Sequence, residues 1–419
     1  MPHRARLNST LTLVFLVLTT VLIYASRLDE APWNHDELSV AVQARSIAAS
    51  GRDIDGRLLP LYFHIRDDVW FQPVLVYLTA LFLTASANPA VASRLPSVAV
   101  GALDVILIFA LARRLFKSDR LALVAAGLLA LTPAHFVYSR LAMDALYPIP
   151  FVLAWLLALL AFLDQPRPWL LLAGAGCLGI GFYAHPTAVL IMPGCVLLTG
   201  LALHLEGVTS PRPYILATLG FFLPLLLLAP WLLQHPHTYL DTVGRWGVHP
   251  AYLRNPLEGL RALANRESLA TRAWLFWDFF NPSYLFFVGS PNLAGSTHRT
   301  GVFLLPVAVL LPVGLYYMRR LTRSQPVSLI LLLGFISVPV VAATFNERQA
   351  IGNELAMLPF AVLLATYGVA QLLSRPSRLS KMSGICLLVL MPIQFAYFYR
   401  DLPTGTRDRT SSAPLVQHE

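Results

Sequence analysis

Long apolar runs, separated by short polar segments, fill most of the chain. A run of about 18 apolar residues is long enough to cross a bilayer as a helix, and eleven stretches approach or exceed that length. They are residues 7–24, 93–112, 121–138, 146–163, 169–184, 187–204, 214–233, 302–318, 327–344, 355–373 and 382–398. The pattern predicts an all-α polytopic membrane protein with about 11 transmembrane helices.

One further segment, FQPVLVYLTALFLTAS (71–86), is apolar but short, and its placement decides the topology. Loops on the cytoplasmic side of a membrane carry an excess of Arg and Lys. If 71–86 does not cross, the clusters RRLFKSDR (113–120), RRLTR (319–323) and RPSRLSK (375–381) share the side of the basic segment MPHRAR. We therefore predict that 71–86 is a juxtamembrane or re-entrant helix at the outer face.

This topology places two long loops, 25–92 and 234–301, on the non-cytoplasmic side, and a short tail, 399–419, with them. The membrane domain then spans residues 1–398. The first apolar stretch is followed by no small-residue cleavage site of the A-x-A kind, so we interpret it as a retained anchor. The inner loops are short and mostly basic, so chemistry is expected on the outer face, at the inner (plasma) membrane of a cell.

Composition supports this class and excludes others. The chain is 56% hydrophobic and only 13% charged, with a formal net charge of +9, and its mean hydropathy is +0.62. In a membrane protein an excess of Arg reports topology, and no nucleic-acid motif is present. The three cysteines, Cys177, Cys195 and Cys386, fall in apolar segments, which argues against a disulfide framework or a CxxC metal site.

The stretch PWNHDELSVAVQARS (32–46) places two adjacent acids at the start of a predicted surface helix that ends at SGRD (50–53). Asn34 fits the N-cap, with Glu37 as its capping-box partner, and acids in a first turn suit the helix dipole. The alternative is that Asp36 is a catalytic carboxylate, able to orient and deprotonate a hydroxyl. The sequence leaves two roles open for Glu37, which either helps Asp36 or caps its own helix.

Several segments in order resemble the bacterial relatives of protein O-mannosyltransferases and of the aminoarabinose transferases that modify lipid A. The resemblance runs over roughly residues 7–375, and its order and spacing are more specific than any single motif. Its carriers are NHDELSVAVQARSIAASG, ASRLPSVAVGALDVILIFALARRLF, YSRLAMDALYPIPFVLAWLLALLAF, GFYAHPTAVLIMP, SYLFFVGSPNLAGSTHRTGVFLLP and RQAIGNELAMLPFAVLLA.

The resemblance implies a GT-C fold glycosyltransferase that uses polyprenyl-phosphate sugars. It implies that Asp36 and Glu37 are the acidic pair of the first loop, with Asp36 as the catalytic base. The family carries a PP-type motif at the end of that loop, often after a basic residue, where this chain has Gln72. Arg66 is then the substitute for a phosphate contact. Relatives also often carry Asp where this chain has Ser290.

Transfer from a lipid phosphate requires groups that stabilise the leaving phosphate. Arg140, His185 and Arg348 lie at the outer ends of predicted spans, where they either bind the donor or contact the headgroups of ordinary lipids. His185 is the strongest, because AHP interrupts an apolar run long enough for two spans. The sugar or lipid phosphate site is therefore predicted to include Arg66, Asp68, Arg140, His185, Tyr284 and Arg348.

Other acids and aromatics have simpler interpretations. Asp67 and Asp68 resemble a sugar-hydroxyl or metal site, but a solvated loop is the simpler view. Asp144 lies four residues after Arg140, which predicts an i,i+4 pair. Asp104 lies within an apolar segment, where a neighbouring helix is expected to supply its partner. In the second outer loop the aromatic residues anchor the membrane interface, while Tyr284, Asn292 and His298 could line the acceptor side. The pair His235 and His237 is too weak a signal for a metal site.

Together these features predict an inverting glycosyltransferase that moves a sugar from polyprenyl phosphate to an acceptor hydroxyl. The acceptor is a protein, a lipid or a glycan, and no nucleic acid is involved. The sequence requires no metal and leaves open whether a divalent cation takes part. A lipid or sugar transporter of the cell envelope is the alternative, although no internal repeat supports it. A scaffold protein is a third class.

Overall fold

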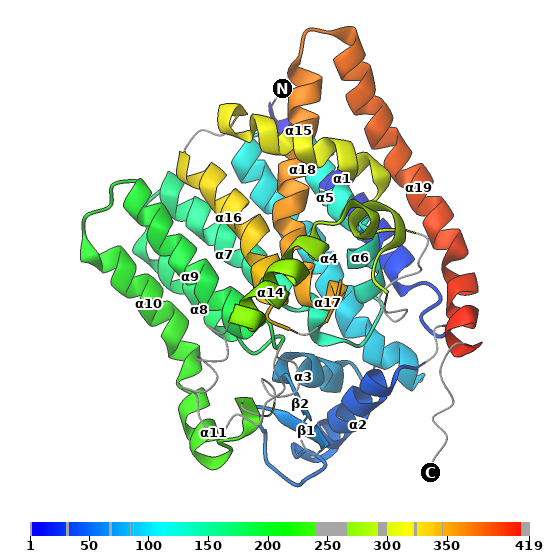
Figure 1. Ribbon diagram of the computed structural model, residues 1–419, viewed down its shortest axis with the longest axis vertical. Coiled ribbons are helices and arrows are strands. Elements are labelled where there is room, and N and C mark those ends of the chain that lie inside the picture. Colours follow the sequence, from blue (N-terminus) through cyan, green and yellow to red (C-terminus); the bar gives the residue numbers. More distant parts are fainter. Residues whose placement is uncertain are drawn as a thin grey trace.

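The computed structural model describes the backbone of residues 2–411, apart from 31–32, 67–68, 84, 87, 240, 242–265, 292–299, 322–324 and 346. Figure 1 shows a bundle of helices with a smaller lobe at its lower edge. The bundle contains α1 (Pro2–Ala25), α4 (Pro89–Phe116), α5 (Asp119–Ala130), α6 (Pro133–Tyr138), α7 (Pro148–Asp164), α8 (Pro168–Gly181), α9 (Ala188–Leu205), α10 (Pro211–Leu225), α11 (Leu228–Gln234), α14 (Arg266–Phe279), α15 (Leu305–Leu321), α16 (Gln325–Ala342), α17 (Ile351–Glu354), α18 (Leu358–Ser374) and α19 (Arg378–Ser411). Short η1 (Asp144–Leu146), η2 (Tyr284–Val288, a π-helix) and η3 (Leu355–Met357) connect them.

Each predicted span coincides with one of these helices or with a broken pair. The stretch 121–138 breaks into α5 and α6 at Pro133, and 214–233 bends by 40° between α10 and α11, just after Pro224. Proline lacks the N–H that would continue the ladder of hydrogen bonds, which explains both breaks. Five described helices are long and apolar enough to cross a membrane, or six if the bent pair counts as one span. The all-α membrane architecture is therefore confirmed, whereas the count of about eleven spans is not.

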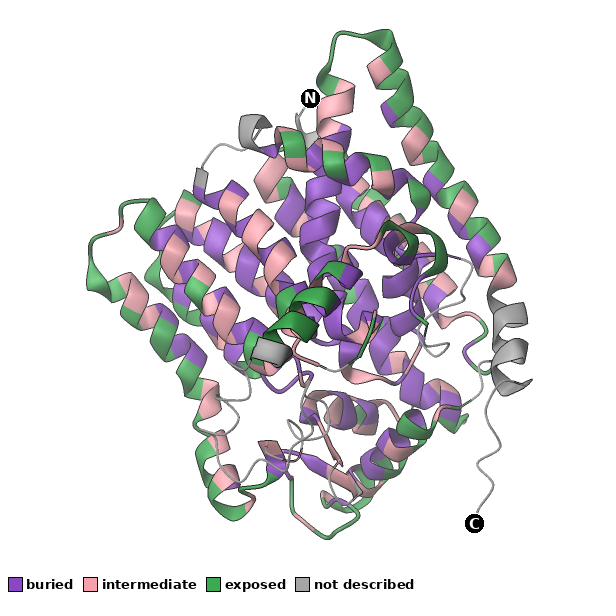
Figure 2. Ribbon diagram, viewed as in Figure 1, coloured by how far each residue is buried: buried purple, intermediate pink, exposed green. Residues whose placement is uncertain are grey.

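Helix α18 forms the centre of the bundle and is 83% buried over its apolar window, against 22% for α19 (Figure 2). It crosses α15 at two glycines. A Cβ atom at Gly314 would overlap the Leu364 carbonyl oxygen, and one at Gly368 would overlap the Leu310 carbonyl oxygen. Small residues let two backbones come this close, which is the usual way that helices pack within a bilayer.

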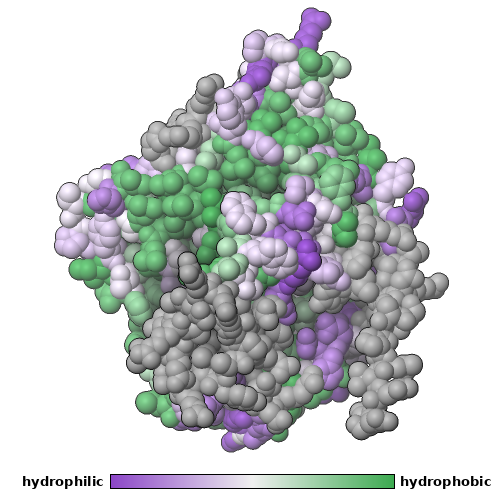
Figure 3. Space-filling view, viewed as in Figure 1, coloured by the Kyte–Doolittle hydropathy of each residue, from purple (hydrophilic) through white to green (hydrophobic). Residues whose placement is uncertain are grey.

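The outer surface of the bundle is apolar. Exposed side chains on α10 include Ile215, Leu219, Phe222 and Leu223, and those on α19 include Leu379, Met382, Ile385 and Val389. Figure 3 shows a broad apolar area over the upper bundle on one face. Such an area on a helical bundle is a lipid-facing surface, so this is a multi-pass membrane protein.

A buried polar chain crosses the bundle at Asp104. Asp104 Oδ2 lies 3.3 Å from His135 Nε2, and His135 Nδ1 lies 2.9 Å from the Tyr24 hydroxyl, which donates to the Ala130 carbonyl at 2.9 Å. The neighbouring helix expected to supply the partner of Asp104 is therefore α6. Through these contacts the polar chain links α1, α4 and α6.

The smaller lobe is formed by the first loop. It contains α2 (His35–Ser50), the antiparallel pair β1 (Phe63–Arg66) and β2 (Val69–Phe71), and α3 (Pro73–Phe82). At 1.5 Å per residue, the ten residues of α3 extend only about 15 Å, half of a bilayer core. This agrees with the prediction that 71–86 does not cross. The two short strands were not predicted, because four and three residues are too few for a periodic signal.

Candidate functional site

The N-terminus of α2 is built as the sequence predicts. Asn34 is the N-cap, and its side-chain oxygen accepts the Asp36 N–H at 2.7 Å. The Glu37 side chain accepts the Asn34 N–H at 3.2 Å and completes the capping box. Gly51, in the left-handed conformation with φ of +68°, ends the helix. This cap fixes the backbone that carries Asp36, whose carboxylate lies at the positive end of the helix dipole.

The structure separates the two adjacent acids. Glu37 is fully buried and accepts hydrogen bonds from Arg94 Nε at 2.9 Å, Arg94 NH2 at 2.7 Å and the Ala142 N–H at 2.9 Å. Both of its oxygens are therefore occupied, and it joins α2 to α4 and to the turn before η1. These contacts agree with the capping role of Glu37, and its help to Asp36 stays a prediction. Asp36 is exposed, and no hydrogen bond or ion pair reaches its carboxylate from the described residues.

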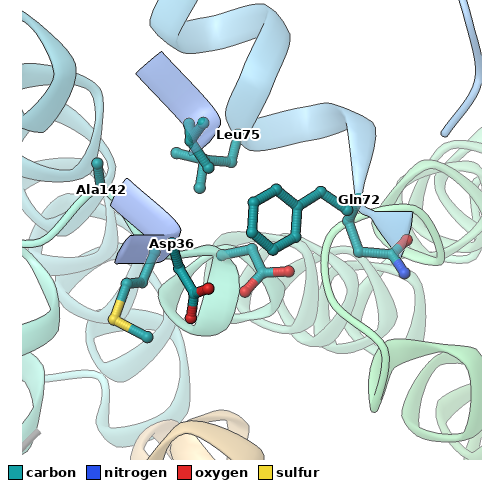
Figure 4. Close-up of a pocket in the computed structure, with 8 residues that line it drawn as sticks. Asp36, Gln72, Leu75 and Ala142 are labelled. Atoms are coloured by element: carbon teal, nitrogen blue, oxygen red, sulfur yellow. The ribbon is translucent and has the colours of Figure 1, made fainter. Parts of the chain in front are cut away.

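Asp36 lines a pocket of about 310 Å³ between the small lobe and the bundle (Figure 4). Its walls come from α2, from the β2–α3 junction and from the turn before α7: Asp36, Val40, Phe71, Gln72, Leu75, Ala142, Met143 and Asp144. Figure 4 shows the amide of Gln72 directed away from Asp36. Gln72 is 3% exposed, and among the described residues its Oε1 has no hydrogen-bond partner. Among the described residues, the pocket thus presents two carboxylates and no cation.

Asp144 is the second carboxylate of the pocket, and its position corrects a prediction. The i,i+4 pair with Arg140 does not form, because residues 139–143 make a turn and not a helix. Asp144 Oδ1 instead lies 3.8 Å from His185 Nε2. His185 is 7% exposed, and burial lowers its pKa to about 3, so the ring is neutral at physiological pH.

Arg140 turns toward α1. Its guanidinium donates to the carbonyls of Ile23 at 3.1 Å, Tyr24 at 2.9 Å and Arg27 at 3.2 Å, and it lies 5.0 Å from the ring of Phe136. Burial lowers the pKa of Arg140 to about 10, so it remains charged. A cation that satisfies the last carbonyls of a helix stabilises that end. These contacts assign Arg140 to the end of α1, and none of them supports the predicted phosphate contact.

Arg348 and Tyr284 each contact an acidic side chain. The Arg348 side chain is 57% exposed, donates from Nε to Asp278 Oδ2 at 2.7 Å and lies 5.0 Å from the ring of Trp274. The accessible guanidinium leaves the predicted phosphate contact open. Tyr284 is buried, and its hydroxyl donates to Glu354 Oε1. Glu354, whose other oxygen has no partner among the described residues, was not singled out from the sequence.

Some predicted residues lie outside the described part of the chain: Asp68, Asn292, His298 and the side chain of Arg66. His235 stacks on Trp231 with ring centroids 4.1 Å apart, as expected of an interfacial aromatic cluster. Within the described residues no group of three or more His, Cys, Asp or Glu side chains could hold a metal ion.

The sequence singled out Asp36 as a candidate base but not most of the residues that line the pocket beside it. Phe71, Leu75, Ala142 and Met143 carry no chemical signal of their own. Asp144 did carry a chemical signal, because an acid at the entrance of an apolar span is costly without a function. Its spacing from Arg140 suggested a structural partner instead.

Comparison with known proteins supports the predicted fold. Residues 72–233, which include Gln72, Asp144 and His185, match the family model described as dolichyl-phosphate-mannose-protein mannosyltransferase. ArnT from Cupriavidus metallidurans bound to undecaprenyl phosphate has a similar structure, with a TM-score of 0.58 at 18% identity. This alignment covers 89% of the present chain and 62% of ArnT. The chain has the GT-C glycosyltransferase fold.

Two further structures support the GT-C fold. ArnT in the apo state gives a TM-score of 0.60 at 16% identity, covering 95% of this chain and 74% of that one. The oligosaccharyltransferase AglB from Archaeoglobus fulgidus, in complex with an inhibitory peptide and a dolichol-phosphate, gives 0.52 at 15% identity, covering 94% and 56%. A search of curated proteins returned no match. The predicted resemblance and the GT-C fold are confirmed, and the chain spans less than two thirds of several structures that it matches.

Proposed function

We propose that this GT-C protein transfers a sugar from a polyprenyl phosphate to an acceptor hydroxyl, with Asp36 as the base. The observation that carries the proposal is the state of the two adjacent acids. Glu37 is buried and fully hydrogen-bonded, whereas Asp36 lines the pocket with a carboxylate that no described residue contacts. A base has to be free to reach the proton that it removes.

The reaction is a single displacement. The Asp36 carboxylate accepts the proton of the acceptor hydroxyl, and the acceptor oxygen forms a bond to the anomeric carbon. The bond from that carbon to the phosphate oxygen breaks, and polyprenyl phosphate leaves with the electron pair. Attack opposite the leaving group inverts the anomeric configuration. Rate enhancement comes from holding both reactants in line and from stabilising the charge on the phosphate.

A cation is needed for the phosphate, because the pocket itself is acidic. Among the described residues, Arg348 offers an exposed guanidinium that Asp278 and Trp274 hold in place. Arg66 is the second candidate, at the end of β1 and five residues before the pocket residue Phe71. The match to ArnT with undecaprenyl phosphate and to AglB with dolichol-phosphate supports a lipid phosphate donor.

The distribution of basic residues supports a site on the non-cytoplasmic face of the plasma membrane. Arg113, Arg114 and Lys117 end α4, while Asp36 lies near the opposite end of that helix, where Arg94 binds Glu37. By the positive-inside rule the Asp36 end faces outward. A lipid or sugar transporter is the alternative, and no comparison favours it.

The test compares Asp36→Asn with Asp29→Asn, which changes an exposed acid seven residues earlier in the same loop. Each full-length variant is incubated in membranes with radiolabelled polyprenyl-phosphate sugars, including mannose and an amino sugar. Loss of a general base costs about 10²–10⁴-fold in rate, so Asp36→Asn should abolish detectable transfer while Asp29→Asn retains it. Undiminished transfer by a folded Asp36→Asn variant would refute the assignment.

A further inference from the structure

We propose that Thr187 and His185 act as positioning residues that hold Asp144, so that the pocket has two carboxylates with separate tasks. Asp36 accepts the proton, and Asp144 orients a hydroxyl of the bound sugar. This inference rests on the proposed function. It starts from three features of the buried imidazole of His185.

The first contact fixes the tautomer of His185. The Thr187 backbone N–H donates to His185 Nδ1 at 3.2 Å. A backbone N–H is only a donor, so Nδ1 has to present a lone pair. The Thr187 hydroxyl lies 2.8 Å from the same nitrogen and adds a second polar contact. The single proton of the neutral ring is therefore on Nε2.

The second feature is that His185 cannot easily turn. It lies in the break between α8 and α9, where the Ala188 N–H donates to the His185 carbonyl at 2.9 Å and the Ile191 N–H donates to the Thr187 carbonyl at 3.0 Å. Thr187 is 1% exposed and His185 is 7% exposed. A packed turn thus fixes both the backbone and the ring.

The third feature is the direction in which the Nε2–H points. Asp144 Oδ1 lies 3.8 Å from Nε2, which is longer than a hydrogen bond but within the reach of a small shift on substrate binding. One carboxylate oxygen of Asp144 thus faces His185. Asp144 also lines the pocket, so its other oxygen can accept a hydrogen bond from a ligand. A neutral donor restrains the carboxylate without adding a positive charge that would attract Asp36.

This arrangement explains why His185 and Thr187, the two polar residues of the AHPT turn (184–187), are both buried. A histidine that bound the lipid phosphate by itself would be expected to point into open space. His185 instead faces an acid, as an imidazole does when it orients a carboxylate. The role that the sequence suggested for His185, direct substrate binding, is replaced by one that acts through Asp144.

A double-mutant cycle tests the dependence on Asp144. His185→Asn removes the donor at the Nε2 position, and His185→Gln places an amide N–H close to it. In the transfer assay we expect His185→Asn to lower kcat/KM about tenfold and His185→Gln to restore most of that loss. In an Asp144→Asn background, His185→Asn should change kcat/KM by less than about twofold. An equal tenfold loss in both backgrounds would overturn the proposal, because His185 would then act independently of Asp144.

A spectroscopic measurement separates this inference from the proposed function. In full-length protein labelled with ¹⁵N-histidine, His185 should show an unprotonated Nδ1 and a protonated Nε2 at neutral pH, and Asp144→Asn should shift the Nε2 signal. Thr187→Val removes the hydroxyl but keeps the backbone N–H that donates to Nδ1, so it should shift the Nδ1 signal without protonating that nitrogen, and Thr187→Ser should restore the original spectrum. A protonated Nδ1, or a spectrum unaffected by Asp144→Asn, would overturn the pairing. If wild-type protein transfers no sugar while the spectrum is as expected, the proposed function fails and the pairing stands.

Discussion

Replacing Arg94 with methionine tests the buried ion pair that fixes the loop beside Asp36. Methionine keeps most of the apolar volume, but Glu37 loses the two donors at 2.9 and 2.7 Å, and the Leu28 carbonyl loses its donor at 2.5 Å. Glu37 remains buried, and among the described residues its remaining partners are the N–H groups of Asn34 and Ala142. A carboxylate charge is then left without a counter-charge.

The geometry sets the size of the effect. Each hydrogen bond to a charged group contributes about 1.5–3 kcal/mol, and breaking one side of a buried ion pair costs about 3–5 kcal/mol. Both side chains are at most 1% exposed, so solvent screening does not reduce this value. We expect Arg94→Met to lower the free energy of unfolding by about 3–5 kcal/mol.

The second variant isolates the stranded charge. In Arg94→Met/Glu37→Gln the buried group is neutral and can still accept the Ala142 N–H. The double variant should therefore be more stable than Arg94→Met, with a loss of about 1–2 kcal/mol relative to wild type. A stabilising effect of a second substitution would be a direct sign of coupling between the two residues.

Unfolding in detergent micelles, followed by both tryptophan fluorescence and circular dichroism, measures these differences and checks for two-state behaviour. The exposed Arg52→Met, in the same lobe, serves as the matched control. A loss below about 1 kcal/mol for Arg94→Met would refute the reasoning. The reasoning would also be refuted if the stability loss of the double variant equals the sum of the losses of Arg94→Met and Glu37→Gln. The charge left on Glu37 would then not be the cause of the destabilisation.

Three further predictions follow from buried polar groups. Asp104→Asn can still donate to His135 Nε2, so it should lower the free energy of unfolding by less than about 1 kcal/mol. Asp104→Leu leaves His135 Nε2 without this partner and should cost about 1–3 kcal/mol. Equal losses for the two variants in unfolding experiments would contradict a hydrogen bond between Asp104 and His135. Arg140→Met should destabilise the protein by about 2–4 kcal/mol, because three carbonyls lose their hydrogen-bond donor. It should leave KM for the lipid donor unchanged. A selective rise in KM would instead support phosphate binding by Arg140. The pKa of His185 falls from about 6.5 in the unfolded chain to about 3 in the folded protein, so the unfolded chain binds more protons between those values and stability decreases as pH falls through that window. At about pH 4.5 the protonation of His185 in the unfolded chain should lower the free energy of unfolding by about 2–3 kcal/mol relative to neutral pH. Denaturant titrations at several pH values should show a weaker pH dependence of stability in His185→Gln than in wild type. The same pH dependence in both proteins would refute this prediction.

The hydrophobic pattern determined most of the fold. Each apolar stretch forms a helix, because a bilayer requires every backbone polar group to be paired within its own segment. Proline positions marked the breaks at Pro133 and near Pro224. Local chemistry also determined the cap of α2, since Asn34, Glu37 and Gly51 act within a few residues of one another. Asp36 became the candidate base because its position on that helix is part of the same local pattern.

What only the tertiary structure decided is which distant groups meet. Glu37 pairs with Arg94, 57 residues away, and this contact separates it from Asp36. Arg140 binds the carbonyls of α1, and Asp144 faces His185 across the bundle instead of the arginine one turn earlier. A buried polar group takes whichever partner packing brings within about 3 Å, and sequence spacing does not record that choice. Hydrophobic periodicity therefore set the helices, while packing between them assigned the chemistry of each buried side chain.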